Sequence, residues 1–381
     1  MSPNFDIPQD YEQDLRARSL PVKDDRKDVD LLERLRSYQA VASEKNIWSF
    51  WDSGLDQIPD WCRRNILSWI RINSPSGWTV RVLDAVPDSP NYALKYVSTE
   101  MLPQAFVDGT MDGPYVGPHS ADFLRGACLY THGGVFLDVG IVLIREFDRV
   151  CWTQLEDPSS PFEVAVPWMH HLFVHVWKGH DNYKGLIDNA LFAPLQESLS
   201  FDDSRASSFH WEFSVDAKVV MEYITQVLCW TRLCLLEATN KDEFSGADYW
   251  TKHILIWDVL QENWGAEATI GFKDFGQRAS DLLALRLDSD PNTPEHKEAH
   301  KLTWHLLSQC SMQKVTHGKG ITKGLQLGYI WDHNPGKDSE PGTFGELLRY
   351  GAEHFEQTRS EIRHVKVPRP AKTFKKGLLE P

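Results

Sequence analysis

Residues 119–148 read HSADFLRGACLYTHGGVFLDVGIVLIREFD and combine a helix, a stop and a buried strand in direct succession. Ser120 is suited to cap the helix, and Gly133 with Gly134 provides its left-handed stop. The apolar stripe of the helix consists of Phe123, Leu124, Ala127, Cys128 and Tyr130. Residues 135–137 then form a buried strand that ends at Asp138. Because open α/β sheets bind ligands at the carboxyl ends of parallel strands, Asp138 is the first candidate for a functional residue.

The chain before this stretch predicts a strand, a helix and a second strand. The aromatic run IWSFW at residues 47–51 is a short buried strand followed by turn residues. Pro59 opens a helix whose apolar residues recur at near-helical spacing, and Pro75 ends it. Residues 78–83 alternate and are rich in β-branched side chains, which is typical of a strand. This order favours a parallel sheet.

The chain after this stretch predicts strands first and helices later. Strands are expected at residues 163–167 and 172–177. Helices are expected at residues 183–199, 215–237, 248–262 and 280–287. This long helical section is expected to lie beside the sheet as an insertion or lid.

The composition limits the class of protein. The chain has 381 residues, of which 41% are hydrophobic and 25% charged, and this is ordinary globular usage. A formal net charge of −14 repels nucleic acid and anionic membranes at long range. Six cysteines lie in apolar segments without a Cys-x-x-Cys pair, which predicts buried reduced thiols. No apolar run reaches the ~18 residues of a membrane span, and the N-terminus has no apolar signal segment, so a cytoplasmic protein is expected.

Three motifs occur in a fixed order and carry a family resemblance. They are IWSFW at residues 47–51, Ser-x-Asp-x-x-Arg at residues 120–125 and GGVFLD at residues 133–138. Together they resemble the capsular polysaccharide synthesis and sugar-binding DXD glycosyltransferases, and the interval between Asp122 and Asp138 is similar to that in the glucosylating clostridial toxins. The resemblance implies a GT-A fold, in which a Rossmann-like, mostly parallel mixed sheet is flanked by helices and a nucleotide-sugar donor lies over the carboxyl ends of its strands.

The resemblance also implies roles for individual residues. Trp51 would stack on the donor base, and Asp122 would accept hydrogen bonds from the ribose or the uracil. Arg125 would steady the sugar or the diphosphate. Asp138 would be the catalytic carboxylate, which binds either a divalent metal, Mn²⁺ or Mg²⁺, or the sugar hydroxyls. The chain departs from the family at Gly140, where a DXD motif has its second carboxylate, so one metal ligand is missing.

A second motif lies late in the chain. Residues 317–323 read HGKGITK and fit His-x-x-Gly-x-x-Lys, which other GT-A transferases use. By that resemblance His317 would be a metal ligand and Lys323 would neutralise the β-phosphate. Each candidate also has a plain structural alternative: Trp51 in the core, Asp122 and Arg125 as a surface pair, Asp138 as a turn former, and the glycine-rich segment as a solvated loop.

The expected organisation follows from these motifs. It comprises a charged flexible segment at 1–35, a nucleotide-sugar-binding core at 36–180, a helical acceptor or lid region at 181–290, the C-terminal part of the core at 291–358 and a basic tail at 359–381. The predicted function is transfer of a sugar from a nucleotide-diphosphate donor to a hydroxyl of a small molecule or saccharide.

Two alternatives remain open at this point. The incomplete DXD motif is compatible with another activated donor such as aminoacyl-tRNA, with the basic tail on RNA phosphates, although the net charge argues against nucleic acid. The other alternative is a protein that binds a donor without catalysis.

Overall fold

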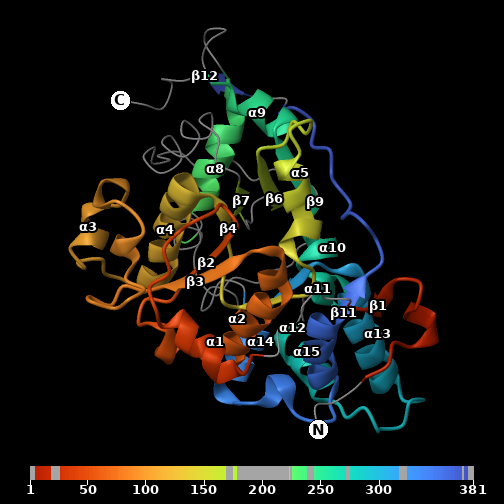
Figure 1. Ribbon diagram of the computed structural model, residues 1–381. Helices are drawn as coiled ribbons and strands as arrows, with labels where there is room; N and C mark the ends of the chain where they lie inside the picture. The colour runs from red at the N-terminus through yellow and green to blue at the C-terminus, as the bar shows by residue number, and fades with distance from the viewer. Residues whose placement is uncertain are drawn as a thin grey trace.

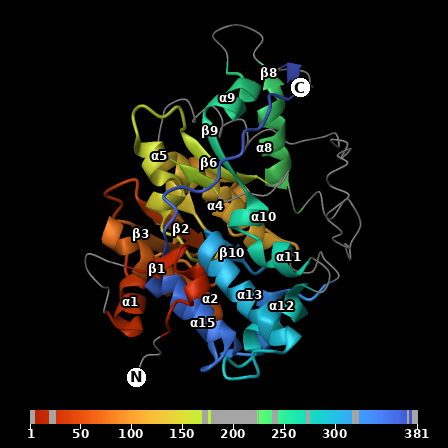
Figure 2. The same ribbon diagram turned by 90° about the vertical axis from the view of Figure 1, so that its right-hand side faces the viewer.

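The computed structural model describes residues 5–18, 26–168, 175–177, 223, 225–237, 244–271, 275–316, 324–370 and 373–375. Within these residues a central sheet is covered by helices on both faces (Figure 1). The helices α12, α13 and α15 gather at one end of the molecule, and α8 and α9 lie at the other, as both views show (Figure 2).

The main sheet has six strands among the described residues, in the order β3-β2-β4-β7-β6-β9. They are β3 (Thr79–Leu83), β2 (Asn46–Phe50), β4 (Gly134–Phe136), β7 (His175–Trp177), β6 (Val164–Trp168) and β9 (Ile254–Asp258). β7 is antiparallel to both of its neighbours, and the other three pairs are parallel. The predicted α/β class with a mixed, mostly parallel sheet is therefore confirmed.

Each face of the sheet has its own helix. On β2, Ile47 packs into the core under α2 (Asp60–Asn73), whereas Trp48 packs into the core under α4 (Val116–His132). Val135 and Phe136 of β4 divide between the same two cores. Both faces are apolar because adjacent strand residues point to opposite sides and each side is covered.

The helix α4 differs from the sequence prediction at its beginning. It starts at Val116, so Ser120 lies inside the helix, where it is buried, and does not cap it. The predicted stop is confirmed: Gly133 follows the helix with a φ of 69°, and Gly134 has a φ of 102°. A Cβ on Gly134 would lie 2.3 Å from the carbonyl oxygen of Asn46, so this position admits only glycine.

The prediction of one helix at residues 248–262 is wrong. The chain forms α9 (Gly246–Lys252), then β9, then α10 (Val259–Glu262). The β9 sequence ILIWD is buried along most of its length and pairs with β6 over five residues. Its apolar residues suit a strand that is covered on both faces, and such a run has no period that separates it from a helix. The region 181–290 is therefore not wholly helical, because part of it completes the main sheet.

The C-terminal half adds a two-stranded ribbon and a group of helices. In the ribbon, β10 (Met312–Lys314) pairs antiparallel with β5 (Ile141–Leu143), directly after Asp138 in the chain. The helices are α11 (Gly265–Ile270), α12 (Phe275–Ala284), α13 (Pro294–Gln309), α14 (Leu327–His333) and α15 (Phe344–His354). α12 covers most of the helix predicted at 280–287. The ribbon brings residues of the C-terminal half to the edge of the sheet at which Asp138 lies.

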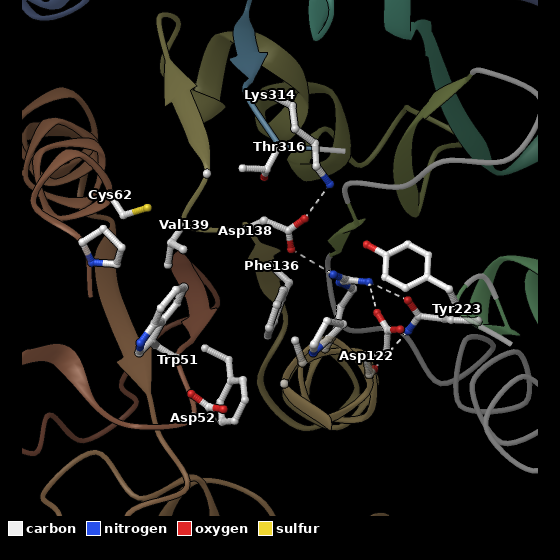
Figure 3. A pocket seen from close by; sticks show the side chains of 18 of the residues that line it. Trp51, Asp52, Cys62, Asp122, Phe136, Asp138, Val139, Tyr223, Lys314 and Thr316 are labelled. Carbon is white, nitrogen blue, oxygen red and sulfur yellow. Dashed lines mark hydrogen bonds and ion pairs between the residues drawn. The ribbon is translucent and has the colours of Figure 1, made fainter. Parts of the chain in front are cut away.

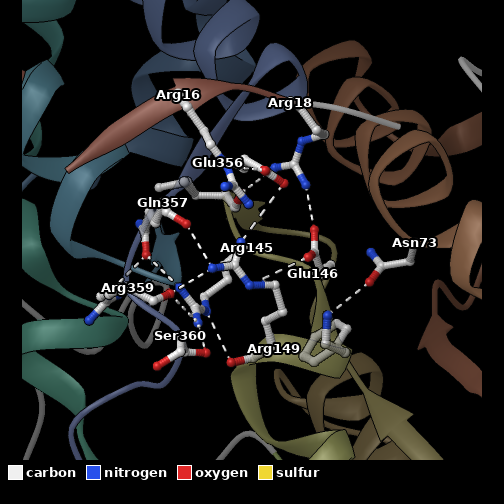
Figure 4. Close-up of polar contacts among 12 residues, drawn as sticks. Arg16, Arg18, Asn73, Arg145, Glu146, Arg149, Glu356, Gln357, Arg359 and Ser360 are labelled. Atoms are coloured by element: carbon white, nitrogen blue, oxygen red, sulfur yellow. Dashed lines mark hydrogen bonds and ion pairs between the residues drawn. The ribbon is translucent and has the colours of Figure 1, made fainter. Parts of the chain in front are cut away.

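The described parts of both terminal segments are packed on the body, contrary to the expectation of flexible ends. β1 (Leu15–Ala17) pairs antiparallel with β11 (Phe355–Gln357), and α1 (Asp28–Leu35) contacts α2. In the tail, Val365 donates to the carbonyl of Ile256 in β9. The segments are held in part by Arg18, Arg145, Arg149 and Arg359, here called the arginine cluster (Figure 4).

The other α-helices and strands are short or lie near the end of the molecule at which α8 and α9 are found. They are α3 (Gln104–Val107), α5 (Thr153–Glu156), α8 (Thr225–Leu235), β8 (Leu236–Glu237) and β12 (Phe374–Lys375). α8 falls within the helix predicted at 215–237, and the helix predicted at 183–199 lies outside the described residues. All six cysteines are buried and free, as predicted. No helix in the described part of the chain is both long and apolar enough to cross a bilayer.

Candidate functional site

A cavity of about 520 Å³ opens where β2 and β4 end. One wall is the beginning of α2 and another is the first half of α4 (Figure 3). Four of the sequence-predicted residues line it: Trp51, Asp122, Arg125 and Asp138. The structure therefore brings together residues that lie up to 87 positions apart in the chain, at the sheet edge where an open α/β fold binds ligands.

Trp51 directly follows β2 and is half-buried beside the cavity. Its backbone N–H donates to the carbonyl oxygen of Leu83 at 2.9 Å, which fixes the residue at the end of the strand. Its Nε1 is buried and has no hydrogen-bond partner among the described residues. The indole thus offers the cavity a flat apolar ring.

Asp138 is positioned by contacts of the backbone on both sides of it. Leu137 N donates to Trp48 O at 2.8 Å, and Asn65 Nδ2 in α2 donates to Val139 O at 2.7 Å. Gly140 O accepts a hydrogen bond from Val315 N at 3.0 Å. The carboxylate is therefore presented to the cavity by a backbone that is held from three directions.

Arg125 joins the two aspartates of the predicted site. Its Nη1 lies 2.8 Å from Asp122 Oδ1, one turn earlier in α4, and its Nη2 lies 3.1 Å from Asp138 Oδ1. Gln226 in α8 accepts from the same Nη1 at 2.5 Å and donates to Asp122 O at 3.0 Å. The guanidinium also lies over the ring of Phe136, 5.0 Å from its centroid. The i, i+3 spacing seen in the sequence thus becomes a fixed, partly buried network.

Lys314 completes this network and was missed by the sequence analysis. Its Nζ lies 2.8 Å from Asp138 Oδ2, so the two oxygens of the carboxylate face two different cations. Lys314 ends the buried strand β10 just before the glycine-rich motif, and a charged residue at the end of such a strand was the available signal. Tyr223, also missed, lines the cavity with its hydroxyl directed toward Asp138 and Lys314 (Figure 3). We call Asp122, Arg125, Asp138 and Lys314 the cavity cluster.

The charges of the cavity cluster support one another. Burial would raise the pKa of Asp138, but Lys314 and Arg125 outweigh it and hold that pKa well below its usual value. Burial would lower the pKa of Lys314, but Asp138 raises it above its usual value. Burial raises the pKa of Asp122 against the opposing effect of Arg125, and it also raises the pKa of Tyr223. Asp138 and Lys314 are therefore both ionised at neutral pH.

The described residues do not fit a divalent metal ion. Asp138 is the carboxylate at the expected place, and both of its oxygens already face cations. No group of three His, Cys, Asp or Glu side chains that could hold a metal is found in the described part of the chain. A second carboxylate is absent at position 140, where the residue is glycine and a Cβ would lie 2.6 Å from Thr316 Oγ1. His317 and Lys323, the other predicted metal and phosphate residues, lie outside the described residues.

Comparisons with known proteins find relatives that match this chain over most of its length. A family model described as capsular polysaccharide synthesis protein matches residues 22–155. The probable glycosyltransferase FCK3 of Fusarium pseudograminearum (strain CS3096) is 45% identical, and the match covers 99% of this chain and 100% of that protein. Glycosyltransferase afumC of Aspergillus fumigatus (strain CBS 144.89 / FGSC A1163 / CEA10) is 35% identical, covering 90% of this chain and 93% of its own. The O-glycosyltransferase PaGT of Phomopsis amygdali is 32% identical, covering 91% of each chain.

Proposed function

This chain belongs to the glycosyltransferase family of these relatives and is therefore a transferase, and from that premise we propose that it moves a sugar from a nucleoside diphosphate to a hydroxyl group of an acceptor. The observation that carries the proposal is the cavity cluster at the carboxyl ends of β2 and β4. It places two cations beside a carboxylate, which suits a ligand that carries both a diphosphate and a polyhydroxylated ring.

In the reaction, the bond between the anomeric carbon and the β-phosphate oxygen breaks, and its electron pair stays on the phosphate. A bond forms between the anomeric carbon and the acceptor oxygen, and the hydroxyl proton passes to solvent. The nucleoside diphosphate therefore leaves with one more negative charge than it had in the donor. Cations near the β-phosphate lower the barrier because they interact more strongly with that developing charge than with the donor.

Each predicted residue has a role within this proposal. Trp51 stacks on the base, since its flat apolar ring lines the cavity. Asp122 accepts hydrogen bonds from the nucleoside, and Arg125 contacts the sugar or the diphosphate. Asp138 accepts hydrogen bonds from the sugar hydroxyls with the oxygen lone pairs that Arg125 and Lys314 leave open. Lys323 and His317 stay predictions.

The acceptor is an alcohol in this proposal, either a small molecule or a saccharide. The O-glycosyltransferase name of the Phomopsis relative supports transfer to oxygen. The full-length glycosyltransferase relatives favour sugar transfer over the aminoacyl-tRNA alternative and over binding without catalysis. A cytoplasmic place is supported by the six free, buried cysteines.

The proposed donor site is not confined to the predicted core at 36–180. Gln226 of α8, Lys314 of β10 and Asp332 of α14 also line the cavity. We therefore propose that described residues of the regions 181–290 and 291–358 also contribute to the donor site.

A thermal-shift panel of nucleoside diphosphates and nucleotide sugars tests the proposal, with release of the nucleoside diphosphate as the activity readout. A donor at ~100 times its Kd adds ~2.7 kcal/mol to the free energy of unfolding. We expect one nucleotide sugar to raise Tm and to be turned over, and Asp138→Ala to fold normally without turnover. Full activity in that variant, or no shift with any nucleotide, contradicts the proposal.

A further inference from the structure

We infer that Lys314 supplies from the chain itself the positive charge that a divalent cation supplies to transferases with two DXD carboxylates, so that donor binding and transfer proceed without a metal ion. This inference rests on the proposed function and adds how the diphosphate is held. It assigns to Lys314 direct contact with the phosphate oxygens of the donor.

The first observation is the space at position 140. A Cβ on Gly140 would lie 2.6 Å from Thr316 Oγ1, which is shorter than any ordinary contact. The contact is with the side-chain hydroxyl of Thr316, so any residue larger than glycine at position 140 requires this side chain to shift. The chain has glycine there, and a lone carboxylate is a poor site for Mg²⁺ or Mn²⁺.

The second observation is what Asp138 holds in place of a metal. Its Oδ2 accepts from Lys314 Nζ at 2.8 Å, and its Oδ1 accepts from Arg125 Nη2 at 3.1 Å. Whether the positive charge belongs to a metal ion or to Lys314, a carboxylate fixes it at the end of β4. Here that charge is covalently attached to the chain, and so its presence does not depend on metal concentration.

The third observation is the spare capacity of Lys314. An ammonium group has three N–H donors, and one of them is used by Asp138 in the described structure. The side chain is 24% exposed and lines the cavity, which places it within reach of a ligand bound there. A diphosphate can therefore accept hydrogen bonds from Lys314 while Asp138 keeps the ammonium in position.

The first experiment measures binding by isothermal titration calorimetry with ADP, CDP, GDP, UDP and dTDP in EDTA and in MnCl₂. We expect one diphosphate to bind with a Kd that changes less than about threefold between the two conditions. Binding that requires Mn²⁺ overturns this inference but leaves the proposed function standing. Absence of binding in both conditions contradicts the proposed function, and the inference falls with it.

The second experiment compares Lys314→Met with Lys45→Met in EDTA. Lys45 is a matched control because its Nζ lies 3.0 Å from Asp148 and its side chain is also 24% exposed, yet it does not line the cavity. We expect Lys314→Met to weaken binding of the diphosphate about ten- to hundredfold, since a charge-assisted hydrogen bond is lost, and Lys45→Met to leave it unchanged.

Two further measurements separate phosphate contact from a merely structural role. Affinity for the matching nucleoside, which has no phosphate, should be the same in Lys314→Met and the wild type, and Lys314→Arg should restore most of the diphosphate affinity. An equal loss of nucleoside and diphosphate affinity would overturn the inference, as would wild-type diphosphate affinity in Lys314→Met.

Discussion

Two clusters of charged side chains lie in this molecule, and they differ in whether backbone carbonyl groups already occupy their hydrogen-bond donors. In the arginine cluster, Arg145 is 2% exposed and donates to the carbonyl oxygens of Arg149, Arg359 and Ser360 at 3.0, 3.1 and 2.7 Å. In the cavity cluster, Asp138 and Lys314 retain 33% and 24% of their side-chain exposure. Backbone groups therefore occupy donors of Arg145, whereas Asp138 and Lys314 line the cavity (Figures 3 and 4).

The difference separates a structural use of charge from a functional one. Buried arginines that donate mainly to carbonyl oxygens tie chain segments together, and here they tie the end of β11 and the tail to the segment after β5. An ion pair with accessible donors at the end of a parallel strand can instead exchange partners with a ligand. Residue type alone does not distinguish the two clusters.

The largest effect is expected from Asp138→Asn. The change removes the charge that orders Arg125 and Lys314, and turnover should fall about a hundred- to thousandfold. Because Asp138 is one third exposed, Tm should change little. Asp148→Asn is the matched control, since Asp148 also pairs with a lysine but lies outside the cavity. Equal loss of turnover in both variants would show that the effect of Asp138→Asn does not depend on its place in the cavity.

The next effect is expected from Arg145→Met in the closed cluster. The variant leaves several buried carbonyl oxygens and Gln357 Oε1 without this donor, so the free energy of unfolding should fall by about 3 kcal/mol. Urea denaturation measures the fall, and calorimetry should give an unchanged Kd for the nucleoside diphosphate. Weakened binding of the nucleoside diphosphate with an unchanged free energy of unfolding would show that Arg145 acts in ligand binding and not in stability.

A smaller effect is expected at the border of the cavity, in Gly140→Ala. The added Cβ meets Thr316 Oγ1, and overpacking of this kind costs about 1–3 kcal/mol. The cost should largely disappear in the double variant with Thr316→Ala, which removes the oxygen. A double-mutant cycle by thermal denaturation measures the coupling, and additive effects of the two changes would argue against this contact.

The smallest effect is the pH dependence of stability contributed by Asp138. Its pKa in the folded protein is lowered by Lys314 and Arg125 against the effect of burial, so the unfolded chain binds more protons at acidic pH. The stabilisation is therefore present above the unfolded pKa of about 4 and is lost as the pH falls below it. Exposure limits it to less than about 1 kcal/mol. The difference in unfolding free energy between wild type and Asp138→Asn should be constant from pH 7 to pH 5, and a steady decline across that range would be inconsistent with a lowered pKa.

Local patterns predicted much of the fold. β2, α2, β3 and β4 lie within one or two residues of their predicted positions, because buried strands and a proline-initiated helix leave clear signals in the sequence. β9 was missed because its first four residues, ILIW, are all apolar and therefore show no period of two. The beginning of α4 was misplaced because Ser120 is buried inside the helix by its neighbours, which a capping rule does not take into account.

The candidate site was predicted only in part. Asp122 and Arg125 fall in one motif and Asp138 in the next, and the structure joins the three by hydrogen bonds. Lys314 lies 176 residues from Asp138, and its role depends on the pairing of β10 with β5. This strand pairing is a long-range contact, and the local sequence around either residue does not indicate it.

The sequence by itself determined the family, the mixed sheet and the carboxylate at the end of β4, because these depend on short-range periodicity and motif spacing. Only the tertiary structure decided which cations face Asp138 and why position 140 is a glycine. Both depend on the ribbon of β5 and β10, which places Lys314 against the carboxylate and Thr316 against Gly140. Antiparallel pairing fixes these neighbours through backbone hydrogen bonds, and the side chains they bring together define the charge of the cavity.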